Sequence, residues 1–156
     1  MKYKLISFLC FFIVFFYSIS FSKELTHIEK LFDIREEITT QGKSIPILIK
    51  EAQYMDIRTF ERIFELNTSI LSTIEAYFRM VKISIIKKNN NNPKIIEILN
   101  NWLNFINNQC TYDLEYLNSS LPQSNNKECI EQIQIAIKNI ENLYEITKLG
   151  IQENKS

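Results

Sequence analysis

The sequence predicts an all-α protein: an antiparallel (up-down-up-down) four-helix bundle with a broken first helix, after an N-terminal signal peptide. The chain has only two Gly and three Pro among its 156 residues, too few for the turns of a many-stranded sheet. The stretch from Asp56 to Lys88 contains neither, and its apolar residues recur at three- and four-residue steps, as in one long amphipathic helix. Such a helix is about 45 Å long and needs partner helices to cover its apolar face.

Residues 1–22 have the three-part pattern of a secretory signal peptide. Lys2 and Lys4 precede an apolar run from Leu5 to Tyr17, and small residues follow, so we expect cleavage near Ser20 to Ser22. The alternative is an uncleaved membrane anchor, because the run approaches the ~17 residues that span a bilayer. The pattern predicts a secreted or periplasmic protein.

Cleavage would leave a bundle domain at residues 23–151 and a frayed C-terminal tail at 152–156. No second apolar run follows the first, so no stable membrane span is expected after cleavage. The chain has 18 basic and 18 acidic residues, without the basic patch that binding to phosphate backbones requires. We therefore expect no nucleic-acid partner.

The first helix is expected to be broken. Apolar spacing marks a helix from Glu24 to about Thr40, interrupted at Gly42, and a second short piece from Ser44 to Tyr54. Pro46 would lie in the first turn of that second piece, where its missing N–H has no intrahelical partner in any case. The interruption could be a kink within one helix or a true corner, and the sequence leaves both open.

Three further helices follow. Asp56 is the expected N-cap of the long helix, and Pro93 begins a third helix that runs to about Leu117. A Ser- and Asn-rich turn then leads to a fourth helix, capped by Asn125 at its start and by Gly150 at its end.

Cys110 and Cys129 remain after signal cleavage. In an exported protein such a pair predicts a disulfide, and closing a loop of about twenty residues would contribute ~3 kcal/mol. If the third and fourth helices are straight and antiparallel, the two cysteines are offset by about 6 Å along the helix axes, in addition to the separation between the helices. A disulfide needs the two Cα atoms within about 7 Å of each other. The third helix is therefore expected to bend or stop soon after Cys110.

No catalytic, metal or cofactor motif stands out, and we expect neither a cofactor nor enzymatic activity. His27 is the only histidine and forms a single Glu-x-x-His with Glu24, whereas di-iron bundles use that motif twice. We expect a partly exposed His27 near the mature N-terminus. Haem binding between His27 and Met55 or Met80 is an alternative, although both methionines are expected to be core residues.

Two surface features are predicted. Asn118 begins an Asn-Ser-Ser acceptor pattern for N-glycosylation, on the turn after the third helix. The long helix is longer than its partners, so its end should project beyond them. That end carries Ile83, Ile86, Lys87 and Lys88, which we predict to form a docking surface.

These features predict an exported, non-enzymatic helical-bundle interaction module that binds a partner protein through a helix face. Two alternatives remain. A secreted helical-cytokine-like signalling ligand would share the signal, the helices and the glycosylation pattern in outline. A carrier of a small hydrophobic ligand or haem would have a pocket between helices, lined by Tyr54, Met55, Tyr77, Met80 or Trp102.

Overall fold

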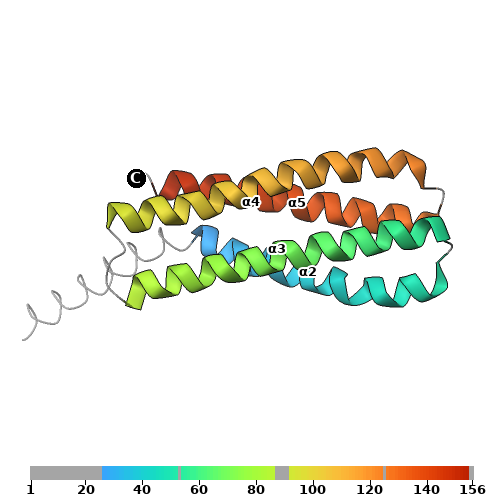
Figure 1. Ribbon diagram of the computed structural model, residues 1–156, viewed down its shortest axis with the longest axis horizontal. Coiled ribbons are helices and arrows are strands. Elements are labelled where there is room, and N and C mark those ends of the chain that lie inside the picture. The colour runs from blue at the N-terminus through green and yellow to red at the C-terminus, as the bar shows by residue number, and fades with distance from the viewer. Residues whose placement is uncertain (1–25, 53, 87–91, 125, 155–156) are drawn as a thin grey trace, which may run out of the picture.

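Four long helices pack against one another in the computed structural model, which describes residues 26–52, 54–86, 92–124 and 126–154 (Figure 1). In chain order they are α2 (Thr26–Glu51), α3 (Tyr54–Ile86), α4 (Pro93–Ser120) and α5 (Lys127–Glu153), with a short 3₁₀ helix, η1 (Leu121–Gln123), after α4. No strand occurs within these ranges. The prediction of an all-α four-helix bundle is confirmed, while the predicted signal peptide at 1–22 lies outside the described residues.

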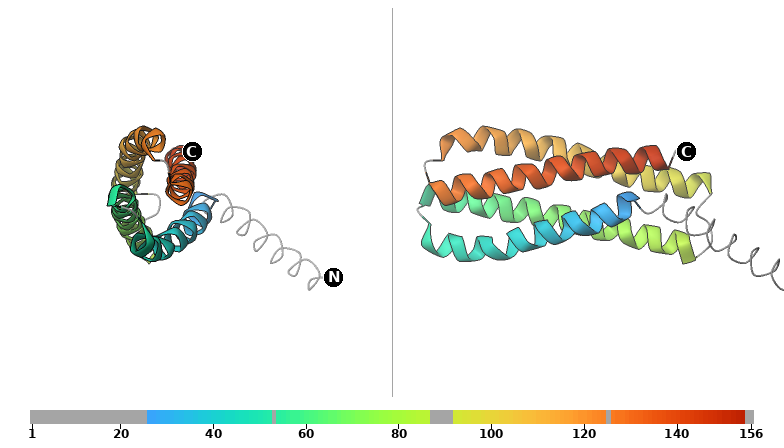
Figure 2. Two further views of the ribbon diagram at one scale, coloured as in Figure 1. Left: turned by 90° about the vertical axis from the view of Figure 1, so that its right-hand side faces the viewer. Right: turned by 180° about the vertical axis from the view of Figure 1, so that it is seen from behind.

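Consecutive helices run in opposite directions along the bundle (Figure 1). Hydrogen bonds between α2 and α3 show the same order: His27, early in α2, bonds Tyr77, whereas Gln41, further along α2, bonds Asn67, earlier in α3. Viewed from its end, the bundle has α2, α3, α4 and α5 following one another around the core, and α5 packs against α2 to close the ring (Figure 2).

The core is built from one buried stripe of each helix. Burying an aliphatic or aromatic side chain of this kind contributes about 1.5–3 kcal/mol, so the stripes hold the four helices together. The apolar face of the long helix α3 is thus covered by its neighbours, as its length and spacing required. The largest fully buried side chains are Tyr77, Phe60, Leu31, Ile38, Ile45, Ile63, Ile70, Ile74, Leu103, Ile106, Leu117 and Ile133.

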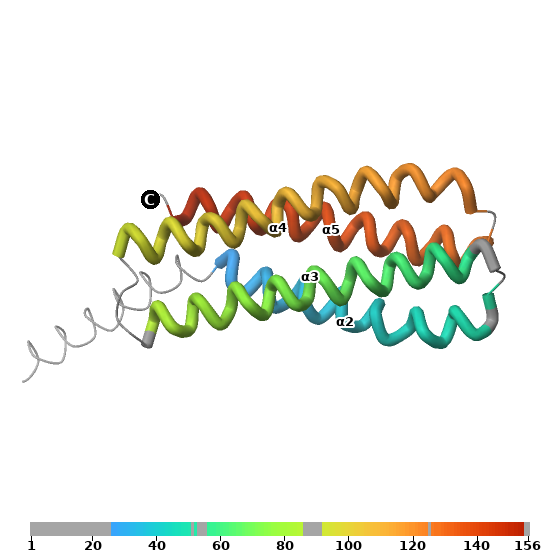
Figure 3. The backbone as a smooth tube through the Cα atoms, viewed as in Figure 1, coloured from blue at the N-terminus to red at the C-terminus, as the bar shows by residue number. Residues whose placement is uncertain are grey.

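Of the two alternatives for the predicted break in the first helix, the corner is wrong, because α2 continues as one helix through Gly42 and Pro46. Pro46 has no N–H for the carbonyl of Gly42, and a proline inside a helix costs about 3 kcal/mol. Ile45, beside it, is fully buried. Gln41 accepts a hydrogen bond from α3 and donates one to α5. These tertiary contacts keep the weak turn helical, and α2 bows instead of breaking (Figure 3).

Two predicted helix starts are displaced. α3 begins at Tyr54, so Asp56 lies in its first turn and is not its N-cap. The Asp56 carboxylate instead accepts from Asn126 Nδ2 at 3.1 Å and from Ser124 Oγ at 3.3 Å, which ties the turn before α5 to the start of α3. Asn126, and not the predicted Asn125, caps α5, since its side chain accepts from two backbone N–H groups of the first turn.

Gly150 lies inside the last helix and is not the C-terminal cap that the sequence predicts. α5 continues to Glu153, whose carboxylate bonds His27 of α2, and Asn154 Nδ2 donates to a side chain of α4 at 2.8 Å. Residues 152 and 153 therefore belong to α5, and Asn154 is bonded to α4, within the segment where the sequence predicts a frayed tail. A Cβ added at Gly150 would lie 2.9 Å from both His27 Cδ2 and Leu103 Cδ1, so glycine here permits close packing between helices.

The predicted disulfide is also wrong. Cys110 and Cys129 are free thiols, and both are fully buried. The bond required α4 to bend or stop soon after Cys110, but α4 continues to Ser120, roughly ten residues or ~15 Å further along the helix. Cys129 lies in the first turn of α5. The two cysteines therefore lie at different levels of the bundle, beyond the ~7 Å between Cα atoms that a disulfide tolerates.

We expect both thiols to resist labelling in the folded protein. Burial raises the pKa of Cys110 to about 12 and also raises the pKa of Cys129, so the reactive thiolate is scarce at neutral pH. A soluble maleimide followed by mass spectrometry of peptides should modify both positions only after unfolding. Labelling of either cysteine in native buffer would contradict the burial, and protection that disappears on adding a reductant would contradict the absence of a bond.

Candidate functional site

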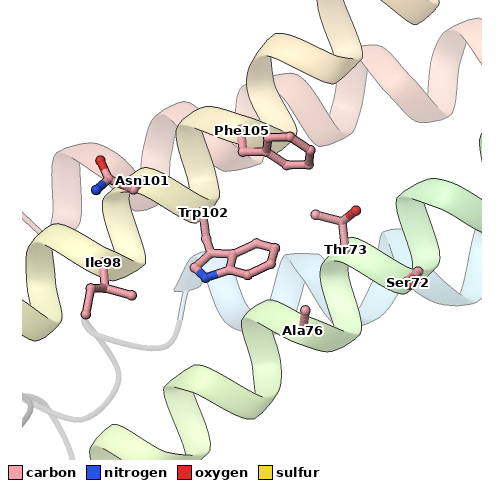
Figure 4. A pocket seen from close by; sticks show the side chains of 7 residues that line it. All are labelled: Ser72, Thr73, Ala76, Ile98, Asn101, Trp102 and Phe105. Carbon is pink, nitrogen blue, oxygen red and sulfur yellow. The ribbon is translucent and has the colours of Figure 1, made fainter.

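A groove of about 490 Å³ opens on the surface between α3 and α4. In Figure 4 the rings of Trp102 and Phe105 extend from α4 towards α3, where Thr73 and Ala76 present short side chains. Large residues on one wall and small residues on the other leave the space open. The full lining is Ser72, Thr73 and Ala76 from α3 with Ile98, Asn101, Trp102 and Phe105 from α4.

The α4 wall of the groove is apolar and accessible. Phe105 is 57% exposed, and Ile98 is also exposed. The rings of Trp102 and Phe105 meet edge to face, with centroids 6.3 Å apart and planes at 77°, a geometry that aromatic pairs prefer. Exposed apolar side chains gathered in one place, as opposed to scattered singly, are typical of binding surfaces.

These side chains belong to a second apolar stripe of α4, separate from the stripe that faces the core. Ile98, Phe105 and Tyr112 recur every seven residues and are all exposed. Gln109, on the same side of the helix, donates from Nε2 to Ser69 Oγ of α3 at 2.8 Å, so the outer stripe borders α3. α4 therefore has two apolar stripes, and only one of them is buried in the core of the bundle.

None of the residues that line the groove carries a formal charge. No Asp, Glu, Lys or Arg occurs between Glu97 and Asp113 on α4, or between Glu65 and Glu75 on α3. Glu75 pairs with Arg35 of α2 at 2.5 Å, and so points away from α4. Aromatic enrichment together with depletion of charge is the composition found at the centre of protein–protein interfaces.

The predicted docking surface lies partly beside this groove. Ile83 is 46% exposed and follows Ala76 by seven residues, which places both on one face of α3. Ile86 is the last residue of α3, but its side chain, like Lys87 and Lys88, lies outside the described residues. Ile83, the part of the prediction that the structure describes, therefore lies on the same face of α3 as the groove, nearer the end of the helix; the docking surface itself stays a prediction.

The predicted glycosylation site lies within a helix and not on a turn. Asn118 is exposed, but α4 extends beyond it, and Asn118 Nδ2 donates to the carbonyl of Leu114 at 2.9 Å. The local sequence suggested a turn because Asn and Ser favour turns, whereas the buried Leu117 keeps this segment on the core. A glycan at Asn118 stays a prediction.

His27 is the centre of a buried hydrogen-bonded cluster, contrary to the prediction of a partly exposed histidine. It is 3% exposed; Nδ1 lies 2.5 Å from Glu153 Oε2, and Nε2 lies 2.8 Å from the Tyr77 hydroxyl. Burial, helped by the charge of Glu153, raises the pKa of Tyr77. The Tyr77 hydroxyl can donate to Nε2 of His27 when the ring carries its proton on Nδ1, which faces Glu153.

This cluster joins α2, α3 and α5 at one end of the bundle. Both ring nitrogens of His27 are engaged, so neither is open to ligate haem iron, and Tyr77 is itself part of the core. Of the other residues predicted to line a carrier pocket, Trp102 lines the groove, Met80 packs against the core, and the side chains of Tyr54 and Met55 lie outside the described residues. We interpret the His27 cluster as structural.

Among the described residues, no group of three or more His, Cys, Asp or Glu is placed to hold a metal ion. No helix among them combines the length and the apolar character needed to cross a membrane.

The geometry defines a four-helix bundle with an apolar, uncharged groove on one side. No protein-family model matches this chain, and comparison with curated proteins and with solved structures finds no match either.

Proposed function

We propose that this protein is an exported, non-enzymatic helical-bundle module that binds a partner protein in the groove between α3 and α4. The observation that carries the proposal is the groove: exposed apolar side chains of α4 lie beside short side chains of α3, and no lining residue is charged. An amphipathic helix laid into such a groove buries its own apolar face. Export rests on the pattern of residues 1–22.

Phe105 and Ile98 offer the partner its largest apolar contacts. Burying a side chain of this size contributes about 1.5–3 kcal/mol, and a few aromatic anchors usually dominate the energy of an interface. The α3 wall supplies Ser72 and Ala76, whose short side chains let another helix approach closely. The groove therefore suits a helix with large apolar side chains.

The connections argue against a helical-cytokine-like ligand. Those bundles run up-up-down-down and need two long crossover connections. Here the helices are joined across residues 52–53, 87–92 and 121–126, and none of these segments is long enough to return along the bundle.

A carrier of a small hydrophobic ligand is the second candidate, because Trp102 lines a mostly apolar space of about 490 Å³. The groove lies open along the surface, however, whereas small-ligand sites enclose about 70–90% of the ligand. A helix covers an open groove more completely than a small molecule does, and this favours the protein partner.

Photo-crosslinking in the native source tests the proposal. A photoreactive amino acid in place of Phe105 should form a defined protein adduct, and one in place of Ile47 should not. Ile47 is a matched control because it is 63% exposed and lies on α2, away from the groove. Adding the purified adduct partner should shift the emission of Trp102, the only tryptophan, to shorter wavelength as water leaves the groove.

Two results would count against a protein partner. Equal adducts at both positions would mean that the groove has no special role. Emission of Trp102 that shifts with a fatty acid but with no crosslinked protein would favour the carrier instead.

A further inference from the structure

The outer stripe of α4 has the spacing of a seam between two helices. It repeats every seven residues with two members per repeat, which is how one helix packs along another. It extends over residues 98–116, about 27 Å of helix. The buried residues of α4 form a different stripe. Ile98, Phe105, Tyr112 and Tyr116 of the seam are exposed, whereas Trp102 also packs against the core and Gln109 bonds α3. The members of the seam are Ile98, Trp102, Phe105, Gln109, Tyr112 and Tyr116.

The seam is nearly symmetric about Phe105. If a second copy of α4 lies antiparallel to the first with the two Phe105 residues facing each other, Ile98 of each copy lies opposite Tyr112 of the other. Lys94 lies just before the seam and Glu115 near its end, and both are exposed. Two antiparallel copies of α4 would therefore place Lys94 of each copy near Glu115 of the other, whereas two parallel copies would place like charges together.

The remaining charges do not oppose this pairing. Reversal about Phe105 brings Glu97 towards Asp113, but Asp113 is buried on the core side of α4. Arg62 of α3, whose guanidinium lies 5.4 Å from the centre of the Tyr116 ring, lies at the end of the seam that receives Lys94 of the other copy. Arg62 is paired with Glu65 at 3.1 Å, so the two together add no net charge there. Between these ends the seam carries no charge on either copy.

We infer that the helix bound in the groove is α4 of a second copy of this chain, packed antiparallel in a two-fold symmetric dimer. The inference rests on the proposed function of the groove and names its partner. In a two-fold interface the same patch serves both copies, and the self-complementary seam meets that requirement. Phe105 of each copy then lies at the centre, beside the short side chains that α3 contributes to the groove.

Sedimentation equilibrium of the purified protein should show a dimer. Phe105→Glu should abolish it, because the change sets two carboxylates side by side at the centre. Ile47→Glu introduces the same charge at an exposed position of α2 and should leave the dimer intact, which controls for loss of the fold. Circular dichroism should show the same helix content for both variants.

A charge reversal tests the direction of packing. Each Lys94–Glu115 pair occurs twice in the dimer, so Lys94→Glu alone or Glu115→Lys alone should raise the dimer Kd about fivefold. The double variant Lys94→Glu/Glu115→Lys should return to the wild-type value. A double variant weaker than either single change would overturn the antiparallel arrangement.

Cysteine crosslinking gives a second test of direction. Mixing Ile98→Cys with Tyr112→Cys under mild oxidation should produce a disulfide between the two chains, and Ile98→Cys alone should not. Self-crosslinking of Ile98→Cys would indicate parallel packing and would overturn the inference. A monomer at every concentration would also overturn it. If that monomer still crosslinks to a different protein through position 105, the proposed function survives; without any adduct at 105, both fail.

Discussion

Replacing Gly150 by Ala is expected to destabilise the protein by up to about 2 kcal/mol, although alanine is the better helix former. The added Cβ would meet His27 Cδ2 and Leu103 Cδ1 at 2.9 Å each. The His27 ring is held by two hydrogen bonds, and Leu103 is fully buried, so neither neighbour moves freely. Overpacking of this kind costs about 1–3 kcal/mol, which exceeds the gain of roughly 1 kcal/mol in helix propensity.

Gly42→Ala is the matched control for this prediction. Gly42 also lies inside a helix, but nothing lies within 4 Å of an added Cβ. The same substitution there should stabilise the protein by about 0.5–1 kcal/mol. Urea unfolding followed by circular dichroism compares the two variants, and a Gly150→Ala protein as stable as Gly42→Ala would mean that the helices do not pack closely at position 150.

A double-mutant cycle locates the clash. Removing the ring with His27→Ala gives the new methyl group room on one side, so Gly150→Ala should cost less in that background than in the wild type. An unchanged cost would assign the effect to Leu103 alone.

Helix starts could be predicted where the signal is local. Pro93 begins α4 as predicted, and the side chain of Asn92 accepts from the N–H of Lys94. The signal at Pro46 is equally local but misleading. Whether a proline breaks a helix depends on what its neighbours contact, and Gln41 is held by α3 and α5, which no pattern within α2 reveals.

The candidate site could be predicted only at its edge. The length of the helix predicted from Asp56 to Lys88 pointed to the end of α3, and Ile83 is exposed there. Of the α4 wall, only Trp102 was predicted, as a residue of the carrier pocket. Ile98 and Phe105 were missed because the two apolar stripes of α4 overlap in sequence. The seven-residue spacing of Ile98, Phe105 and Tyr112 was the available signal.

The His27 cluster could not be predicted from the sequence. Its members come from three helices and are separated by 50 and 126 residues along the chain. A histidine near an expected terminus gives no sign of such partners. Their meeting depends on the register in which α2 packs against α3 and α5, and that register is set by the whole core.

Raising the pH above about 9 is expected to destabilise the protein steeply, chiefly through Cys110. Burial, and next the charge of Asp113, raise the pKa of this thiol from 9.0 to about 12. Above pH 9 the unfolded chain releases the thiol proton while the folded chain retains it. The folded state then binds more protons, and its stability falls with increasing pH.

The size of the effect follows from the shift. Each group with such a displaced pKa lowers the free energy of unfolding by about 1.4 kcal/mol per pH unit between its two pKa values, or up to about 4 kcal/mol for Cys110 by pH 12. Cys129, whose pKa is also raised, acts in the same direction. Tyr77 contributes to the loss of stability only above pH 10, because the ordinary pKa of tyrosine is 10.0. The pH dependence of stability just above pH 9 therefore reports mainly on the two thiols.

Urea titrations on either side of pH 9, with and without reductant, measure this slope. Cys110→Ala removes one thiol and should make the slope shallower, whereas Tyr77→Phe should leave the slope just above pH 9 unchanged. A slope that appears only after reduction would mean that the cysteines are bonded, because a disulfide has no proton to lose. A slope present without reductant requires two buried, protonated thiols, and it follows from the continuation of α4 past Cys110 to Ser120.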